Sequence, residues 1–160
     1  QHVISAEELL LTLVDDAEPQ AEIAGIALVA DFKQLHERHI HGDGDMLYRA
    51  LDNLLRNALK FTPEGGTVRV AATSTNSHLS IDIIDNGPGV STQELEQIRM
   101  RFYRSHNAKP ISGHGLGLAI ADKIINAHKG MLQLKHRDNG DNGLHVFIQL
   151  PLAQQLDNLA

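Results

Sequence analysis

The stretch DGDMLYRALDNLLRNALKFTP, residues 43–63, has the spacing of a helix with one buried face. Apolar residues recur every three or four positions, which predicts a stripe that packs into a core. The stripe consists of Leu47, Leu51, Leu54, Leu55 and Ala58. Asp43 or Asp45 is placed to cap the start of the helix, and Pro63 ends it. The rest of the fold is expected to pack around this segment.

The same helix has a second, polar face. Asn53, Asn57 and Lys60 follow one another at intervals of four and three residues, so they share a side. Asn favours caps and turns over helix interiors, so two Asn within one helix are unusual. The simpler interpretation is two solvated amides on the exposed side of the helix. Taken alone, this face favours the solvated interpretation over a binding site.

The composition is that of an ordinary globular domain. The chain has 160 residues, 42% hydrophobic and 21% charged, which suffices for one domain with a core. The net charge of −6 does not favour nucleic acid or an anionic membrane surface. The absence of cysteine excludes disulfides and thiolate metal sites. The start of the sequence is not a signal peptide and is not Met, so we expect a piece of a longer protein.

Helices and strands are expected to alternate irregularly. A capping box at Ser5 and Glu8 starts a helix that runs toward Ile23, with Pro19 kinking or interrupting it and Gly25 ending it. Further helices are expected at 91–100 and 116–128, and strands at 3–4, 26–32, 39–42, 67–75, 79–84, 131–137 and 144–150. Strands in hairpins with helices between them predict an α+β, two-layer sandwich. Its mixed sheet would be mostly antiparallel, with helices on one face.

One loop, Asp85-Asn86-Gly87-Pro88-Gly89, directly follows a strand that is expected to be buried. Its glycines allow positive φ and close backbone approach. An ordinary turn with an Asx bond is one interpretation. The other is a ligand loop, in which the ionised Asp85 accepts from the exocyclic amine of adenine and repels the carbonyl of guanine.

A second glycine-bearing loop, GHGLGLA at 113–119, opens a helix. Free backbone N–H groups at a helix N-terminus suit a phosphate. The spacing is neither G-x-G-x-x-G nor a P-loop, so the signal is weak by itself.

In combination the motifs are specific. NLLRNALKF, DNGPGV, RFYR and GHGLGLAI, in this order, resemble the N, G1, F and G2 boxes of the ATP-binding catalytic domain of sensor histidine kinases. This two-component signalling family belongs to the GHKL superfamily and has the Bergerat ATP-binding fold. The resemblance covers about 5–152. It implies one catalytic ATP-binding domain over 1–160, with the dimerisation and sensor domains outside it.

For the N box, the resemblance implies that Asn57 is the Mg²⁺ ligand and that Asn53 lines the same site. Lys60 would contact phosphate, and Phe61 would pack near the adenine. Asn57, Lys60 and Arg104 are the expected catalytic residues.

For the G1 and F boxes, the resemblance implies that Asp85 binds the adenine amine and that Gly87 and Gly89 shape its loop. Arg104 would contact the γ-phosphate, with Tyr103 beside it.

For the G2 box, the resemblance implies that the phosphate side of the site and the helix start are formed by Gly113, His114, Gly115, Leu116, Gly117 and Leu118. The segment 105–112 would be the ATP lid. Three positions depart from the family: Arg99 stands where Phe is usual, His114 stands where a small hydroxyl residue is common, and Val146 stands where an aromatic residue is often found.

The resemblance also implies partners. The nucleophile would be a histidine on a separate dimerisation domain, homodimeric in the full-length protein, with relay to a response regulator. His36-Glu37-Arg38 resembles the start of a phosphoacceptor box but lacks its continuation, so His36 is interpreted as a surface residue. The domain would be cytoplasmic, in an inner-membrane sensor protein of bacteria, and would touch neither nucleic acid nor membrane.

Two alternatives remain open. A degenerate module would bind ATP for regulation without transferring phosphate. A GHKL-type ATPase would carry Glu at position 53 to activate water, and Asn53 cannot take that proton. His39 and His41 share a strand face, but without a third ligand they do not indicate a transition-metal site.

Overall fold

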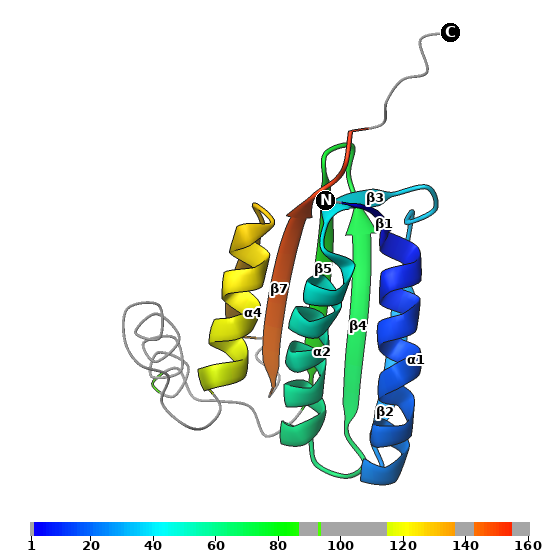
Figure 1. Ribbon diagram of the computed structural model, residues 1–160. Helices are drawn as coiled ribbons and strands as arrows, with labels where there is room; N and C mark the ends of the chain where they lie inside the picture. The colour runs from blue at the N-terminus through cyan, green and yellow to red at the C-terminus, as the bar shows by residue number, and fades with distance from the viewer. Residues whose placement is uncertain (1, 87–92, 94–114, 137–142, 155–160) are drawn as a thin grey trace, which may run out of the picture.

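A five-stranded sheet carries all three described helices on one face (Figure 1). The computed structural model describes residues 2–86, 93, 115–136 and 143–154. The strands are β1 (His2–Ser5), β2 (Ala27–Phe32), β3 (His39–Gly42), β4 (Thr67–Ser74), β5 (His78–Asp85), β6 (Met131–His136) and β7 (Leu144–Pro151). The helices are α1 (Ala6–Ala24), α2 (Gly44–Phe61) and α4 (Gly115–Ala127). The predicted two-layer α+β sandwich is confirmed.

The main sheet has the order β2-β4-β5-β7-β6. Only the β2–β4 pairing is parallel among the strands described; the other three pairings of this sheet are antiparallel. The sheet is therefore mixed and mostly antiparallel, as predicted. Strands β1 and β3 form a separate antiparallel pair.

The core lies between the sheet and the helices. Strands β4 and β5 alternate strictly, and their inward apolar residues are at most 1% exposed: Val68, Val70, Ala72, Leu79, Ile81 and Ile83. The predicted stripe of α2 faces them, with every member buried. Burial of this apolar area supplies most of the driving force for folding.

Helix α1 begins and ends as predicted. The Ser5 side chain accepts a hydrogen bond from the Glu8 N–H at 3.2 Å, and Gly25 ends the helix with φ of 70°. Pro19 does not interrupt it, which corrects part of the expectation. Pro19 is exposed, as is Asp15, the residue four positions earlier, so water can satisfy the Asp15 carbonyl.

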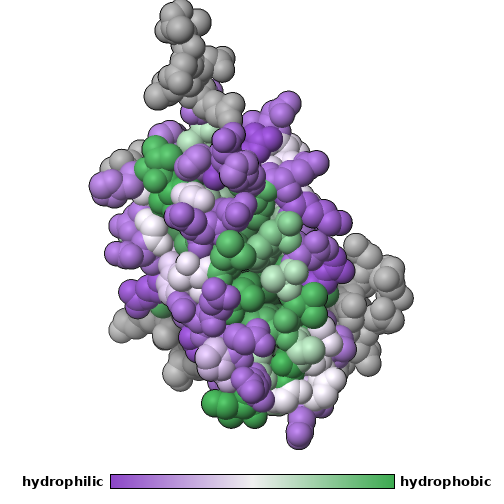
Figure 2. Space-filling view, turned by 90° about the vertical axis from the view of Figure 1, so that its right-hand side faces the viewer, coloured by the Kyte–Doolittle hydropathy of each residue, from purple (hydrophilic) through white to green (hydrophobic). Residues whose placement is uncertain are grey.

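Strand β2 is one edge of the main sheet. Figure 2 shows an apolar band on the side of the molecule that carries α1 and β2, with polar groups on both sides. Val29, in β2, is 44% exposed. Asp31 in the same strand forms ion pairs with Arg69 and Lys33. Charges beside an open edge disfavour pairing with another sheet.

Candidate functional site

Helix α2 presents its two amides on one flank. Asn53 and Asn57 are half-buried and Lys60 is exposed. Within the described part of the chain, neither amide has a hydrogen-bond partner. The Lys60 Nζ lies 5.8 Å from the centre of the Phe61 ring, and Phe61 is 45% exposed. The two amides and the Lys60 ammonium are at least partly exposed, so a ligand can reach them.

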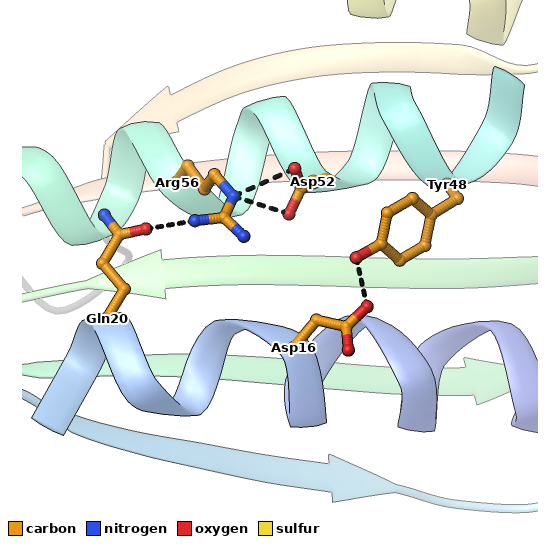
Figure 3. Close-up of polar contacts among 5 residues, drawn as sticks. All are labelled: Asp16, Gln20, Tyr48, Asp52 and Arg56. Atoms are coloured by element: carbon orange, nitrogen blue, oxygen red, sulfur yellow. Dashed lines mark hydrogen bonds and ion pairs between the residues drawn. The ribbon is translucent and has the colours of Figure 1, made fainter. Parts of the chain in front are cut away.

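The opposite flank of α2 is attached to α1 (Figure 3). The Tyr48 hydroxyl donates to Asp16 Oδ2 at 2.5 Å, and Arg56 Nη1 donates to Gln20 Oε1 at 2.5 Å. Arg56 Nε also donates to Asp52 Oδ1 at 2.9 Å. The spacing of Tyr48, Asp52 and Arg56 could have suggested this second polar flank, but the sequence analysis missed it.

These contacts fix how α2 is rotated about its axis. Around the helix, the amides lie on the side of the core stripe away from α1, which is the α4 side. The hydrogen bond to Asp16 and, secondarily, burial raise the pKa of Tyr48 to about 12, which keeps its hydroxyl protonated and able to donate.

Asp85 ends the central strand β5. It is 7% exposed, and its Oδ1 accepts a hydrogen bond from the Leu144 N–H at 3.3 Å. The next residue, Asn86, exchanges two bonds with Thr67: its Oδ1 accepts from the Thr67 N–H at 2.6 Å, and its own N–H donates to the Thr67 carbonyl at 3.1 Å. A backbone group of β7 therefore holds the Asp85 carboxylate at the end of β5, and backbone groups of β4 hold the residue that follows it.

Gly66 brings the end of α2 to the end of β5. A Cβ added there would come within 2.4 Å of Thr62 Cγ2 and 2.9 Å of Asn86 Oδ1. Thr62 directly follows α2, and its hydroxyl donates to the Ala58 carbonyl at 2.8 Å. The amide-bearing helix and Asp85 thus meet at the same end of the molecule.

Helix α4 runs antiparallel to α2. Its C-terminal His128 accepts a hydrogen bond from the N–H of Asp43, the N-cap of α2, at 3.1 Å. A helix rises about 1.5 Å per residue, so Gly115 and Asn57 each lie about 20 Å from this contact, along their own helices. The first turn of α4 is therefore level with Asn57, and Figure 1 shows it at the end of the molecule where α2 and β5 end.

The start of α4 suits an anion. Gly115, Leu116 and Gly117 form its first turn, whose N–H groups have no partner within the helix. Leu118 is 8% exposed and belongs to the hydrophobic core, so its side chain packs inward. Any contact of Leu118 with a phosphate would therefore go through its backbone.

The remaining predicted site residues lie outside the described residues. They are Gly87, Gly89, Tyr103, Arg104, Gly113 and His114, together with Arg99 and the predicted helix and lid between 91 and 112. The predicted surface position of His36 is confirmed, because its side chain is 87% exposed.

The described residues fit a magnesium ion better than a metal that needs a protein cage. They contain no cluster of three or more His, Cys, Asp or Glu that could hold a metal. Mg²⁺ keeps several waters and binds substrate phosphates together with few protein ligands. The amide oxygens of Asn57 and Asn53 can supply such ligands.

Comparison with known proteins identifies the family. Residues 42–154 match the family described as "Histidine kinase-, DNA gyrase B-, and HSP90-like ATPase". The signal transduction histidine-protein kinase BaeS of Escherichia coli (strain K12) is 34% identical over 119 residues, which cover 73% of this chain and 25% of BaeS.

Solved structures of histidine kinases resemble this chain as well. The structure of the mycobacterial sensor histidine kinase MprB matches with a TM-score of 0.76 and 27% identity, over 94% of this chain and 97% of that one. Full-length ShkA in complex with AMPPNP matches with a TM-score of 0.76 and 26% identity, over 95% of this chain and 31% of that one.

The chain therefore belongs to the family of histidine kinase-, DNA gyrase B- and HSP90-like ATPases, as an ATP-binding catalytic domain of the sensor histidine kinase type. It spans about a quarter of the length of BaeS. No helix in the described part of the chain is long and apolar enough to cross a membrane.

Proposed function

We propose that this domain binds Mg²⁺-ATP and transfers the γ-phosphoryl group to a histidine on a separate dimerisation domain. One observation carries the proposal. The amide face of α2, the buried carboxylate of Asp85 and the first turn of α4 lie at the same end of the molecule. The amides suit a metal ion, the carboxylate suits the amine of a purine, and the helix start suits a phosphate chain.

Asp85 is the group proposed to select adenine. Its Oδ1 accepts a hydrogen bond from the Leu144 N–H, and an ionised carboxylate accepts but never donates, so a ligand group that binds it must be a donor. The amine of adenine is such a donor, whereas the carbonyl of guanine would face a buried negative charge. An unpaired or repelled buried polar group discriminates strongly between ligands.

The phosphates are proposed to lie between α2 and the start of α4. The N–H groups of the first α4 turn and the Lys60 ammonium would offset their charge, with Arg104, Gly87, Gly89, Gly113 and His114 as further expected contacts. Mg²⁺ would neutralise charge on the phosphate oxygens, held by Asn57 with Asn53 beside it.

The reaction needs a nucleophile from another part of the protein. An imidazole nitrogen of the acceptor attacks the γ-phosphorus, the bond from phosphorus to the ADP oxygen breaks, and ADP leaves. The imidazole gives up its proton to solvent or to a nearby base. We further propose that the phosphoryl group passes to a response regulator, and that the domain works on the cytoplasmic side of an inner-membrane sensor.

The test combines binding and transfer. Calorimetric titration with AMPPNP and with GMPPNP, each with and without Mg²⁺, should give binding that prefers adenine and is much weaker without the metal. Radiolabelled ATP with a separately supplied dimerisation domain should label that domain, whereas the catalytic domain alone should remain unlabelled.

Two results would contradict the proposed function and favour one of the two alternatives. Binding without transfer to any supplied histidine domain would favour the regulatory module. Sustained ATP hydrolysis by the domain alone would favour the ATPase alternative, although Asn53 cannot act as a general base for water.

A further inference from the structure

The imidazole of His128 links the start of α2 to the end of α4. Its Nε2 lies 3.1 Å from the Asp43 backbone nitrogen, and its Nδ1 lies 2.7 Å from the Ile124 carbonyl oxygen. Asp43 is also the N-cap whose side chain accepts from the Met46 N–H at 3.1 Å. The ring therefore binds the residue at which α2 begins.

The two contacts determine which tautomer the imidazole of His128 adopts. A backbone N–H can only donate, so Nε2 accepts from Asp43. The proton of the neutral imidazole is then on Nδ1, where it is donated to the Ile124 carbonyl. Both ring nitrogens are used, and each partner is a backbone group.

Gly42, the residue before Asp43, lies against the same edge of the ring. A Cβ at position 42 would lie 2.2 Å from His128 Cδ2 and 2.5 Å from its Nε2. No side chain fits there, so the ring lies directly against the strand that leads into α2. The position of His128 is therefore set by close packing as well as by hydrogen bonds.

The geometry points to a role beyond this local contact. We propose that His128 is a positioning residue for the nucleotide site, because it sets the axial offset between α2 and α4 and hence how Asn57 faces the first turn of α4. This inference rests on the proposed function. Apolar packing between two helices has no preferred direction, whereas a hydrogen bond weakens steeply when its donor and acceptor are displaced or turned.

Paired variants separate this role from simple capping of α4. His128→Gln keeps an acceptor near the position of Nε2, and His128→Asn keeps only a donor near that of Nδ1. Gly42→Ala should displace the ring, and Gly42→Ala combined with His128→Ala should relieve that clash. Ser74→Ala is the control, because Ser74 donates to the Gln34 carbonyl, away from both helices.

The first measurement is the affinity for AMPPNP with Mg²⁺. His128→Asn and Gly42→Ala should weaken it by about 2- to 30-fold, the range seen for residues that act on a site without touching the ligand. His128→Gln should stay within about 2-fold of wild type. The double variant should be no weaker than His128→Ala alone. Ser74→Ala should lower stability and leave the affinity unchanged.

The second measurement is amide hydrogen exchange without nucleotide. The inference expects His128→Asn to speed exchange at 119–122, more than a turn away from residue 128, and Ser74→Ala to leave it unchanged there. Exchange that rises only at 43–47 and 124–130 would reduce His128 to a local cap and overturn the inference. Equal loss of affinity in Ser74→Ala would also overturn it. If wild type bound no AMPPNP, the proposed function would fail, and the exchange at 119–122 would still decide the positioning role.

Discussion

The backbone of Gly66 lies so close to Thr62 that a Cβ at position 66 would come within 2.4 Å of the Thr62 methyl carbon. On its other side the same Cβ would approach Asn86 Oδ1 to 2.9 Å, and that oxygen already accepts a hydrogen bond from β4. Gly66 therefore sets the distance between the helix that carries Asn57 and the strand that ends in Asp85.

Replacing Gly66 with Ala should lower the free energy of unfolding by about 1–3 kcal/mol, the usual cost of forcing a methyl group into a filled site. The affinity for AMPPNP should fall as well, because α2 and β5 must move apart. Denaturant unfolding and calorimetry measure the two effects. The control is Gly44→Ala in the first turn of α2, where the nearest atom to an added Cβ is 3.7 Å away. It should be neutral or stabilising, and a Gly66→Ala variant that matches it would contradict the proposed close contact.

Tyr48→Phe should destabilise the domain in a pH-dependent way. The folded pKa is raised from 10.0 to about 12, chiefly by the hydrogen bond to Asp16. Because the folded value is the higher one, this stabilisation is fully present below about pH 10 and is lost as the pH rises toward 12. Removing the hydroxyl should lower the free energy of unfolding by about 1 kcal/mol at pH 8, and by progressively less above pH 10.

The comparison of wild type with Tyr48→Phe, by urea unfolding between pH 8 and 11, cancels other groups that titrate there. Asp16→Asn tests the same contact from α1, and it should reduce the pH-dependent difference in the same way. A difference that did not change with pH would show that the hydrogen bond does not hold Tyr48 protonated.

Asp85→Asn should weaken ATP binding sharply and change the base preference. An amide oxygen can still accept from the Leu144 N–H, so the fold should persist. The amide nitrogen then faces the adenine amine, donor against donor, at a cost of about 1–3 kcal/mol, or about 5- to 150-fold in affinity. The same nitrogen can donate to a guanine carbonyl, so the ratio of AMPPNP to GMPPNP affinity should fall. Near-normal adenine affinity by calorimetry would remove Asp85 from the base site.

Asn57→Ala should act through the metal. The affinity for AMPPNP with Mg²⁺ should drop, while the weak binding measured in EDTA should change little, because the alanine removes an oxygen ligand and leaves the rest of the site. Arg49→Ala is a control on the same helix, because Arg49 is exposed and lies two turns away from Asn57. If Asn57→Ala behaved like wild type at limiting Mg²⁺, the metal would have to be held elsewhere.

The sequence predicted the helices and strands better than it predicted which of them lie side by side. The apolar stripe of α2 and the caps at Ser5, Asp43 and Gly25 are local patterns, so their spacing suffices to place them. The parallel pairing of β2 with β4 joins segments separated by β3 and α2, and no local pattern encodes it.

Long-range polar contacts were missed for the same reason. The Tyr48–Asp16 bond spans 32 positions and the His128–Asp43 bond spans 85, so neither has a signature in a short window of sequence. Asn53 and Asn57 are predicted as site residues because the family motif, rather than helix periodicity, distinguishes them from solvated amides.

Pro19→Ala should stabilise the domain. Helix α1 continues through Pro19, although the ring supplies no N–H to the Asp15 carbonyl. Alanine restores that donor and is favoured over proline within a helix by about 3 kcal/mol. Loss of the restraint that proline imposes on the unfolded chain offsets about 1 kcal/mol of this gain. A net gain of about 1–2 kcal/mol in the free energy of unfolding is expected from urea denaturation.

Glu18→Ala, exposed in the same turn, should change stability by no more than about 0.5 kcal/mol. The affinity of Pro19→Ala for AMPPNP should equal that of wild type, because in the described part of the chain α1 is connected to the proposed site through its contacts with α2. Unchanged or reduced stability would mean that the backbone between Asp15 and Pro19 has adapted to the missing donor so fully that restoring it gains nothing.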